Sequence, residues 1–286
     1  MTQGRSSLAN STRSELTKQF TTSMWWILGL VLFVYVAVTA GGLAGTFGAL
    51  ASGALPPEAA NGPALAPEIL PPVIYSIATA VGYVFPLLIG TLLVTGEFRH
   101  KTLTPTFLAT PRRGVALAGK VAAGVVMGAL YAALAIVAAV GVGAALLAAF
   151  DIDTQLGSSD TWALIGRMAI AFILWVLIGI GVGTLVRNQV AAVVGVLAFT
   201  QFIEPILRTV AAFVDGLSDV TRYLPGAASD TLVGASIYTN LGGESTAGLE
   251  WWVGGLVMLG YAVVFLLLGV LLWQLRERSR ESISLD

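Results

Sequence analysis

The sequence predicts an all-α membrane protein with six transmembrane helices in a single domain, residues 1–286. The chain is 56% hydrophobic and only 11% charged, with a mean hydropathy of +0.85, whereas soluble domains carry about 25% charged residues. Six apolar stretches are long enough to cross a hydrocarbon core, which takes about 20 helical residues. They lie at about 24–44, 72–95, 115–149, 162–186, 190–214 and 251–274. The third stretch is longer than one span requires, so it must tilt, kink or project beyond the bilayer.

Basic residues are distributed unevenly among the connections, and this predicts the orientation. If the spans alternate, twelve of the fifteen basic residues fall on one side, and the opposite connections hold ten acidic residues. Short connections rich in Lys and Arg stay in the cytoplasm, so we expect both termini there. Tryptophans mark both expected interfaces, as amphipathic rings do: Trp25, Trp26 and Trp273 on the inner side, and Trp162, Trp251 and Trp252 on the outer side.

Residues 6–22 are predicted to form an interfacial helix before the first span. Leucine and phenylalanine recur at fourfold spacing, and Arg13, Glu15 and Lys18 fall on other faces, as expected of a helix that lies on a membrane surface. Thr12 and Glu15 have the spacing of a capping box. The alternative is an unstructured tail in front of the first span.

The most elaborate polar segment, residues 96–120, lies between the second and third stretches. A short helix at 104–110, framed by two prolines, would present Phe107 and Leu108 as apolar knobs. The basic residues around it can pair with acidic groups of a partner protein or with anionic lipid headgroups. Glu97 favours the partner protein, because a lipid-binding cluster has no use for a carboxylate. Glu97 can instead hold a nearby basic residue or the N-terminal helix in place.

Several kinds of chemistry are excluded by residue counts and by one failed motif. Cysteine is absent and His100 is the single histidine, which argues against thiolate or histidine metal sites and against a Ser-His-Asp enzyme. Residues 114–121 nearly match a phosphate-binding loop, but Val121 stands where Mg²⁺ needs Ser or Thr, and the segment does not follow a strand. We therefore expect no catalysis, no cofactor and no nucleic-acid binding by this chain. Lys120 is expected to anchor the third span at the inner interface.

Charged residues inside the predicted spans are the other candidate site. Glu204 falls in the outer third of the fifth span, Pro205 follows it, and Arg208 lies one turn later, where it can pair with Glu204. This pair either fixes an outer gate or takes part in proton movement or substrate binding. Arg167, near the start of the fourth span, either snorkels outward or becomes another partner of Glu204.

Small and aromatic residues within the spans admit more than one interpretation. Three glycine pairs have the small-xxx-small spacing that lets helix backbones approach, either inside the bundle or between two copies: Gly41/Gly45, Gly124/Gly128 and Gly179/Gly183. Four larger residues are candidates to line a cavity, although packing is the default for each: Tyr83, Tyr131, Trp175 and Gln201.

The polar segment resembles the cytoplasmic coupling segment of permeases in the type-2 ATP-binding-cassette (ABC) exporter superfamily. The residues that carry this resemblance are Glu97, Arg99, Lys101, Thr102, Leu103, Leu108, Pro111, Arg112, Arg113 and Lys120. Lys101 departs from the pattern, since the family often has glycine there. Residues 13–18 followed by Trp25 and Trp26 resemble the elbow helix of the same group, and residues 223–226 resemble its last outer loop. With six spans and both termini inside, the resemblance covers the whole chain.

The resemblance implies a bacterial multi-pass permease of the cytoplasmic membrane that exports a hydrophobic or amphipathic substrate. It implies an elbow helix, a cytoplasmic coupling helix between spans 2 and 3, and a re-entrant outer segment between spans 5 and 6, whose break Glu204 and Pro205 would mark. A separate ABC ATPase subunit would bind ATP and Mg²⁺, and a second copy or a homologous permease would complete the pathway among membrane lipids. The residues leave two alternatives: a stand-alone ion-coupled transporter using Glu204 and Arg208, or a membrane subunit that binds a partner without transporting.

Overall fold

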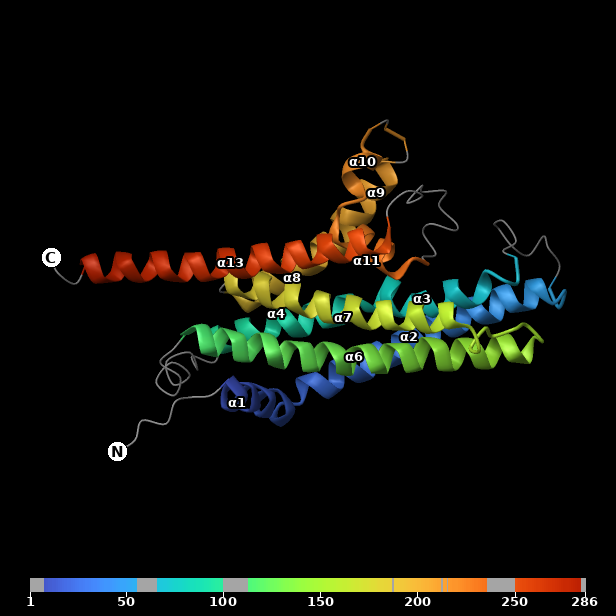
Figure 1. Cartoon of the computed structure of the whole chain (residues 1–286), viewed down its shortest axis with the longest axis horizontal. Coiled ribbons are helices and arrows are strands. Elements are labelled where there is room, and N and C mark those ends of the chain that lie inside the picture. The colour runs from blue at the N-terminus through green and yellow to red at the C-terminus, as the bar shows by residue number, and fades with distance from the viewer. Residues whose placement is uncertain are drawn as a thin grey trace.

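The computed structural model describes residues 8–55, 66–99, 113–186, 188–211, 213–214, 216–235 and 250–283, and every regular element in these ranges is helical. Figure 1 shows long helices lying side by side in one bundle, with α1 (Leu8–Thr21) and the C-terminal end of α13 (Trp251–Ile283) at the same end. The remaining elements are α2 (Met24–Ala51), α3 (Leu70–Gly82), α4 (Val84–Arg99), α6 (Arg113–Ala149), α7 (Ser159–Leu185), α8 (Gln189–Ala198), η2 (Phe199–Ile203), α9 (Glu204–Ala211), α10 (Ser218–Thr221) and α11 (Pro225–Val233).

Six helical segments are long and apolar enough to cross a membrane, as the sequence predicts. They are Met24–Ala51, Leu70–Arg99, Gly114–Ala149, Ser159–Leu185, Gln189–Ala211 and Trp251–Leu272. The first runs further than predicted, because the Gly- and Ala-rich stretch after residue 44 continues the helix. The third belongs to α6, whose 37 residues make a helix about 55 Å long at 1.5 Å per residue. It is therefore much longer than the ~30 Å hydrocarbon core.

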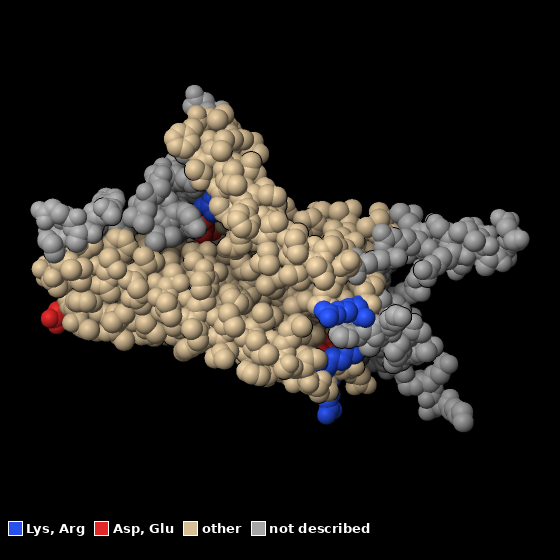
Figure 2. All heavy atoms as spheres, turned by 180° about the vertical axis from the view of Figure 1, so that it is seen from behind, with Lys and Arg blue, Asp and Glu red and all other residues tan. Residues whose placement is uncertain are grey.

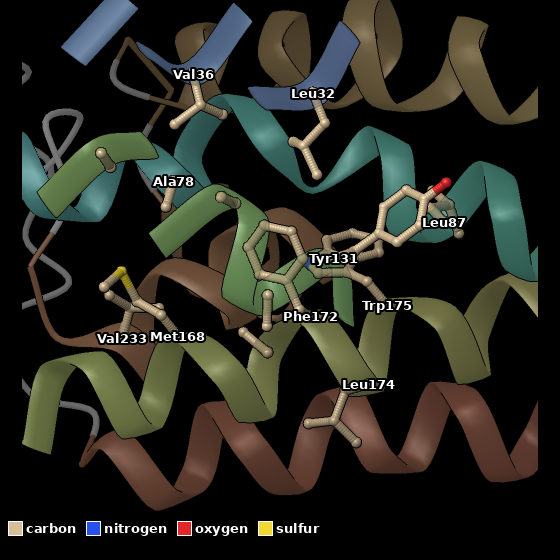
Figure 3. Packing of buried hydrophobic residues seen from close by; sticks show 14 of the residues in the cluster. Leu32, Val36, Ala78, Leu87, Tyr131, Met168, Phe172, Leu174, Trp175 and Val233 are labelled. Atoms are coloured by element: carbon tan, nitrogen blue, oxygen red, sulfur yellow. The ribbon is translucent and has the colours of Figure 1, made fainter. Parts of the chain in front are cut away.

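Tight helix packing holds the centre of the bundle together. The glycines at 90 and 179 bring the backbones of α4 and α7 into contact, since a Cβ at either position would lie 2.2 Å from a carbonyl oxygen of the other helix. Gly124 and Gly128 also face α7: a Cβ would lie 2.5 Å from the Ile180 side chain at the first and 2.8 Å from the Ile173 Cα at the second. These two glycines therefore pack inside the bundle. Figure 3 shows Tyr131 of α6 meeting Phe172 and Trp175 of α7 in the core, and all three are fully buried.

The fifth span bends away from the bundle. Its first part, α8, lies along the bundle, whereas α9 and α10 project sideways (Figure 1). The bend follows the π-helical turn η2 and coincides with Glu204 and Pro205. Pro205 lacks a backbone N–H and a π turn breaks the regular hydrogen-bond ladder, and both features bend helices. The projection exposes large apolar side chains, including Phe202 at 66% and Phe213 at 84%.

The short helix α11 returns from this projection into the bundle. All nine of its residues are buried, and it packs mainly against α13, with further contacts to α7 and α3. Pro225 begins the helix, where a missing N–H costs nothing. Gly234 ends it with a positive φ of 80°, which glycine adopts without steric cost. This helix therefore carries backbone and polar side chains into an otherwise apolar interior.

Candidate functional site

Two clusters of buried charge lie at different levels of the bundle. Figure 2 shows basic side chains gathered at one end of the molecule, and a second pair of charges in a recess beside the α9–α10 projection. We call the first the inner cluster (Glu15, Lys18, Glu97 and Lys120) and the second the outer cluster (Glu204, Arg208 and Asp230).

The inner cluster ties the N-terminal helix to two spans. Nζ of Lys120 lies 2.8 Å from Oε2 of Glu15 in α1 and 2.8 Å from Oε1 of Glu97 in α4. Nζ of Lys18 lies 2.8 Å from Glu15 and 3.0 Å from Glu97. The side chains of Lys120, Glu15 and Glu97 are at most 7% exposed, whereas that of Lys18 is 39% exposed. Two carboxylates thus face two ammonium groups, and three of these four side chains are buried.

Lys18 is held in its charged form. Burial by itself lowers the pKa of Lys18, but the hydrogen bonds and negative charges of Glu15 and Glu97 outweigh it, so the pKa is raised above its usual value. Lys18 therefore stays protonated at neutral pH and supports both carboxylates.

The near-match to a phosphate-binding loop has a packing explanation. A Cβ at Gly119 would lie 2.2 Å from the Ser11 hydroxyl and 3.1 Å from its backbone carbonyl carbon, so glycine lets α1 lie directly on α6. The next residue, Lys120, then reaches Glu15. Lys120 is 3% exposed and lies between the carboxylates of Glu15 and Glu97, and its role as an interfacial anchor stays a prediction.

The predicted N-terminal helix is present, but its predicted capping box is not. The described helix begins at Leu8, and the Thr12 hydroxyl donates to the Leu8 carbonyl oxygen at 3.0 Å. Thr12 is therefore inside the helix, and Glu15 serves the inner cluster instead of the helix start. The suggestion that Glu97 holds this helix in place agrees with its pair to Lys18.

Most of the predicted coupling residues lie outside the described residues: Lys101, Thr102, Phe107, Leu108, Pro111 and Arg112. The described chain stops at Arg99, the last residue of α4, and resumes at Arg113, the first residue of α6. Through Glu97, two residues before the end of α4, and Lys120, seven residues after the start of α6, the inner cluster joins these two helices to α1. Arg13 of α1 is exposed.

The outer cluster is built around the start of α11. Oε1 of Glu204 accepts a hydrogen bond from the backbone N–H of Ala227 at 3.0 Å, and Glu204 is 2% exposed. A carboxylate is favourable at a helix N-terminus because the free N–H groups and the helix dipole attract negative charge. A Cβ at Gly226 would lie 2.5 Å from this carboxylate, so glycine makes the approach possible. Within the described residues, Oε2 of Glu204 has no hydrogen-bond partner.

Asp230 is the member of this cluster that sequence reasoning missed. Nη2 of Arg208 lies 2.9 Å from Oδ2 of Asp230, and both side chains are about nine-tenths buried. The sequence places Asp230 among the acidic residues of an outer loop. No hydropathy signal marks nine-residue α11 as a buried helix.

Arg167 does not belong to the outer cluster. Its guanidinium carbon is 6.0 Å from the centre of the Trp251 ring, a distance at which a cation is attracted to an aromatic face. It forms no ion pair with Glu204 within the described residues. Of the two expectations for Arg167, partnership with Glu204 is therefore wrong, and snorkelling stays a prediction for this half-buried side chain.

Two cavities adjoin at the outer cluster. The smaller, of about 90 Å³, is lined by Glu204, Arg208 and Asp230 with Thr79, Tyr83, Ser229 and other residues. The larger, of about 340 Å³, is lined almost wholly by apolar side chains of α4, α7, α8 and α13. Thr200 lines both. Of the four suggested cavity residues, Tyr83 lines the smaller cavity and Trp175 lines the larger one. Tyr131 lies in the core, and Gln201 is exposed.

An aromatic pair stands between the cavities and is fixed by hydrogen bonds. The rings of Tyr83 and Trp175 have centroids 4.8 Å apart. The Tyr83 hydroxyl donates to the Thr200 carbonyl oxygen at 2.9 Å, and the Trp175 indole N–H donates to the Ser229 hydroxyl at 3.1 Å. The site thus consists of the smaller, charged cavity and the larger, apolar cavity, with the aromatic pair of Tyr83 and Trp175 between them.

No group of three or more His, Cys, Asp or Glu side chains suited to a metal ion occurs among the described residues. A comparison of the chain with models of known protein families finds no match, and a comparison with curated proteins finds none either.

Proposed function

We propose that this chain is the permease subunit of an ATP-driven exporter of the type-2 ABC superfamily. The helix α1 serves as the elbow, residues 96–113 as the coupling element on the cytoplasmic side, and α11 as the re-entrant outer segment. A separate ABC ATPase binds and hydrolyses ATP with Mg²⁺. Two permeases, identical or homologous, form the pathway in the cytoplasmic membrane of a bacterium.

The inner cluster is the observation that carries this proposal. A partner that pushes on residues 100–112 acts on the ends of α4 and α6, and the cluster joins these ends to α1 through ion pairs of 2.8–3.0 Å. Breaking a buried ion pair leaves an uncompensated charge at a cost of about 3–5 kcal/mol. The three elements therefore move as one body, which is what transmission of force from a cytoplasmic subunit requires. A lipid anchor alone needs no such connection.

The charge distribution supports the orientation. Arg13 and Lys18 belong to α1, and Lys120 of α6 contacts Glu15 of α1. Figure 2 shows basic side chains gathered at one end of the molecule. Basic connections are retained in the cytoplasm. Both described chain ends, α1 and the end of α13, share this side, as an even number of spans demands.

Purification of the tagged chain from its native membranes in a mild detergent tests the proposal. We expect an ABC ATPase to co-purify in stoichiometric amount. Because arginines 112 and 113 would face acidic groups of that subunit, Arg112→Glu with Arg113→Glu should remove it. The same double reversal at arginines 278 and 280, near the C-terminal end of α13, is the matched control and should retain it.

The proposal fails if no ATPase co-purifies and transport survives ATP depletion. The buried carboxylates of Glu204 and Asp230 beside Arg208 would then favour the second candidate, a stand-alone ion-coupled transporter. In that case Glu204→Gln should abolish the dependence of transport on the ion gradient.

A further inference from the structure

We infer that the two adjoining cavities form a binding site for an amphipathic amine, with its ammonium group beside Glu204 and its apolar tail in the larger cavity. The site would take an alkylammonium, either a free amphipathic amine or the headgroup of an amine-bearing lipid. That such a molecule is the transported substrate rests on the proposed function; that it binds does not.

The charges of the smaller cavity select a cation. The outer cluster holds two carboxyl groups and one guanidinium, and the guanidinium of Arg208 lies 2.9 Å from Asp230. Glu204 uses one oxygen for the N–H of Ala227, and its Oε2 has no hydrogen-bond partner within the described residues. An unpaired buried carboxylate oxygen is costly. An ammonium donor in the smaller cavity, which Glu204 lines, would satisfy this oxygen.

The aromatic pair of Tyr83 and Trp175 favours the same ligand. The Tyr83 ring lines the smaller cavity, and Trp175 packs against it with 4.8 Å between ring centroids. Ammonium groups bind over the faces of such rings. Because the tyrosine hydroxyl and the indole N–H are already engaged, the rings are held in place before a ligand arrives.

The larger cavity suits an apolar tail. Its walls are side chains such as Leu87, Ile178, Val182, Val196 and Phe265, and its volume of about 340 Å³ is at the lower end of the roughly 300–1,000 Å³ of small-molecule sites. It continues from Thr200, the residue it shares with the charged recess. The geometry therefore fits one molecule with a charged head and a single hydrocarbon tail better than two separate ligands.

The test measures binding to the full chain in nanodiscs of an uncharged glycolipid, with protein-free nanodiscs subtracted. The probes are radiolabelled decylamine, decanol and decanoate, which share a tail and differ in headgroup charge. We expect saturable binding of decylamine and binding of the other two that is weaker by about tenfold or more, the usual worth of a hydrogen bond to a charged group. Equal binding of the three probes would overturn the inference.

Two variants locate the site. Glu204→Gln keeps an oxygen that can accept from Ala227 but removes the charge, and should weaken decylamine binding by about tenfold or more. Gly195→Leu fills the larger cavity from a position where a Cβ meets no atom within 4 Å, and should weaken it too. Gly166→Leu, an equally open position outside the cavity, is the control and should leave binding unchanged. Unaltered affinity in both site variants would refute the assignment.

Two further comparisons separate the outcomes. Adding phosphatidylethanolamine to the nanodiscs should displace decylamine if the natural ligand is a lipid ammonium, and should not if it is a free amine. The measurement needs no ATPase. If decylamine does not bind but an ATPase co-purifies, the binding site is overturned and the proposed function stands. If decylamine binds but no ATPase co-purifies, the proposed function is overturned and the binding site stands.

Discussion

Replacing Gly179 with leucine is expected to prevent the bundle from assembling. A Cβ at this position would lie 2.2 Å from the Leu87 carbonyl oxygen, 3.0 Å from the Thr91 nitrogen and 3.1 Å from the Gly90 Cα. All three are backbone atoms, so no side-chain rotation can relieve the overlap and α4 must move away from α7. These two helices share the most extensive contact in the structure. Overpacking a core typically costs about 1–3 kcal/mol and more where backbones collide.

The measurement is the yield of monodisperse protein on size exclusion in mild detergent. Gly179→Leu should lose most of it, and the residual protein should unfold at a markedly lower temperature. Gly166→Leu lies in the same helix at a position with no atom within 4 Å of the added Cβ. It should match the parent protein, which controls for hydrophobicity and helix propensity. Normal elution and unfolding of Gly179→Leu would show that the α4–α7 contact is not as close as described.

Replacing Lys120 with methionine is the second change with a large expected effect. It removes the buried ammonium group that lies between the carboxylates of Glu15 and Glu97, whose side chains are 4% and 7% exposed. Leaving a buried charge uncompensated costs about 3–5 kcal/mol. We therefore expect a large drop in the thermal unfolding temperature. Proteolysis within α1 should also accelerate, because Glu15 no longer holds that helix to the bundle.

Two further variants make this prediction specific to charge. Lys18→Met removes an ammonium group that is 39% exposed, so it should cost only about 1 kcal/mol, as exposed pairs do. Lys120→Met combined with Glu97→Gln leaves one carboxylate and one ammonium group, and should recover part of the lost stability. If Lys18→Met and Lys120→Met destabilise equally, burial does not govern the cluster as we describe.

These results would also bear on function, because the inner cluster lies where a cytoplasmic partner is proposed to act. A variant that loosens α1 without unfolding the bundle should weaken the link between ATP hydrolysis and transport. The outer cluster belongs to α9 and α11, and helices α3, α4, α7, α8 and α13 contribute to the walls of its two cavities. The two clusters are therefore open to separate mutational tests.

The spans, the N-terminal helix and the bend in the fifth span could be predicted because each depends on neighbouring residues. About twenty apolar residues in succession suffice to mark a membrane helix, and Pro205 disrupts a helix through its own missing N–H. The glycine pairs were recognisable too, but their place inside the bundle was not. Spacing along one helix does not say which helix faces it.

The partners of the buried charges were decided by the tertiary structure alone. Lys120 meets Glu15 across 105 positions of sequence and Lys18 meets Glu97 across 79, so no local pattern connects them. Asp230 looked like a loop residue because α11 is too short to show a membrane helix, yet packing against α13 and α7 buries it beside Arg208. Hydropathy determines which segments leave water. Which charges then neutralise one another depends on contacts between distant helices, since a buried charge requires a partner wherever the fold supplies one.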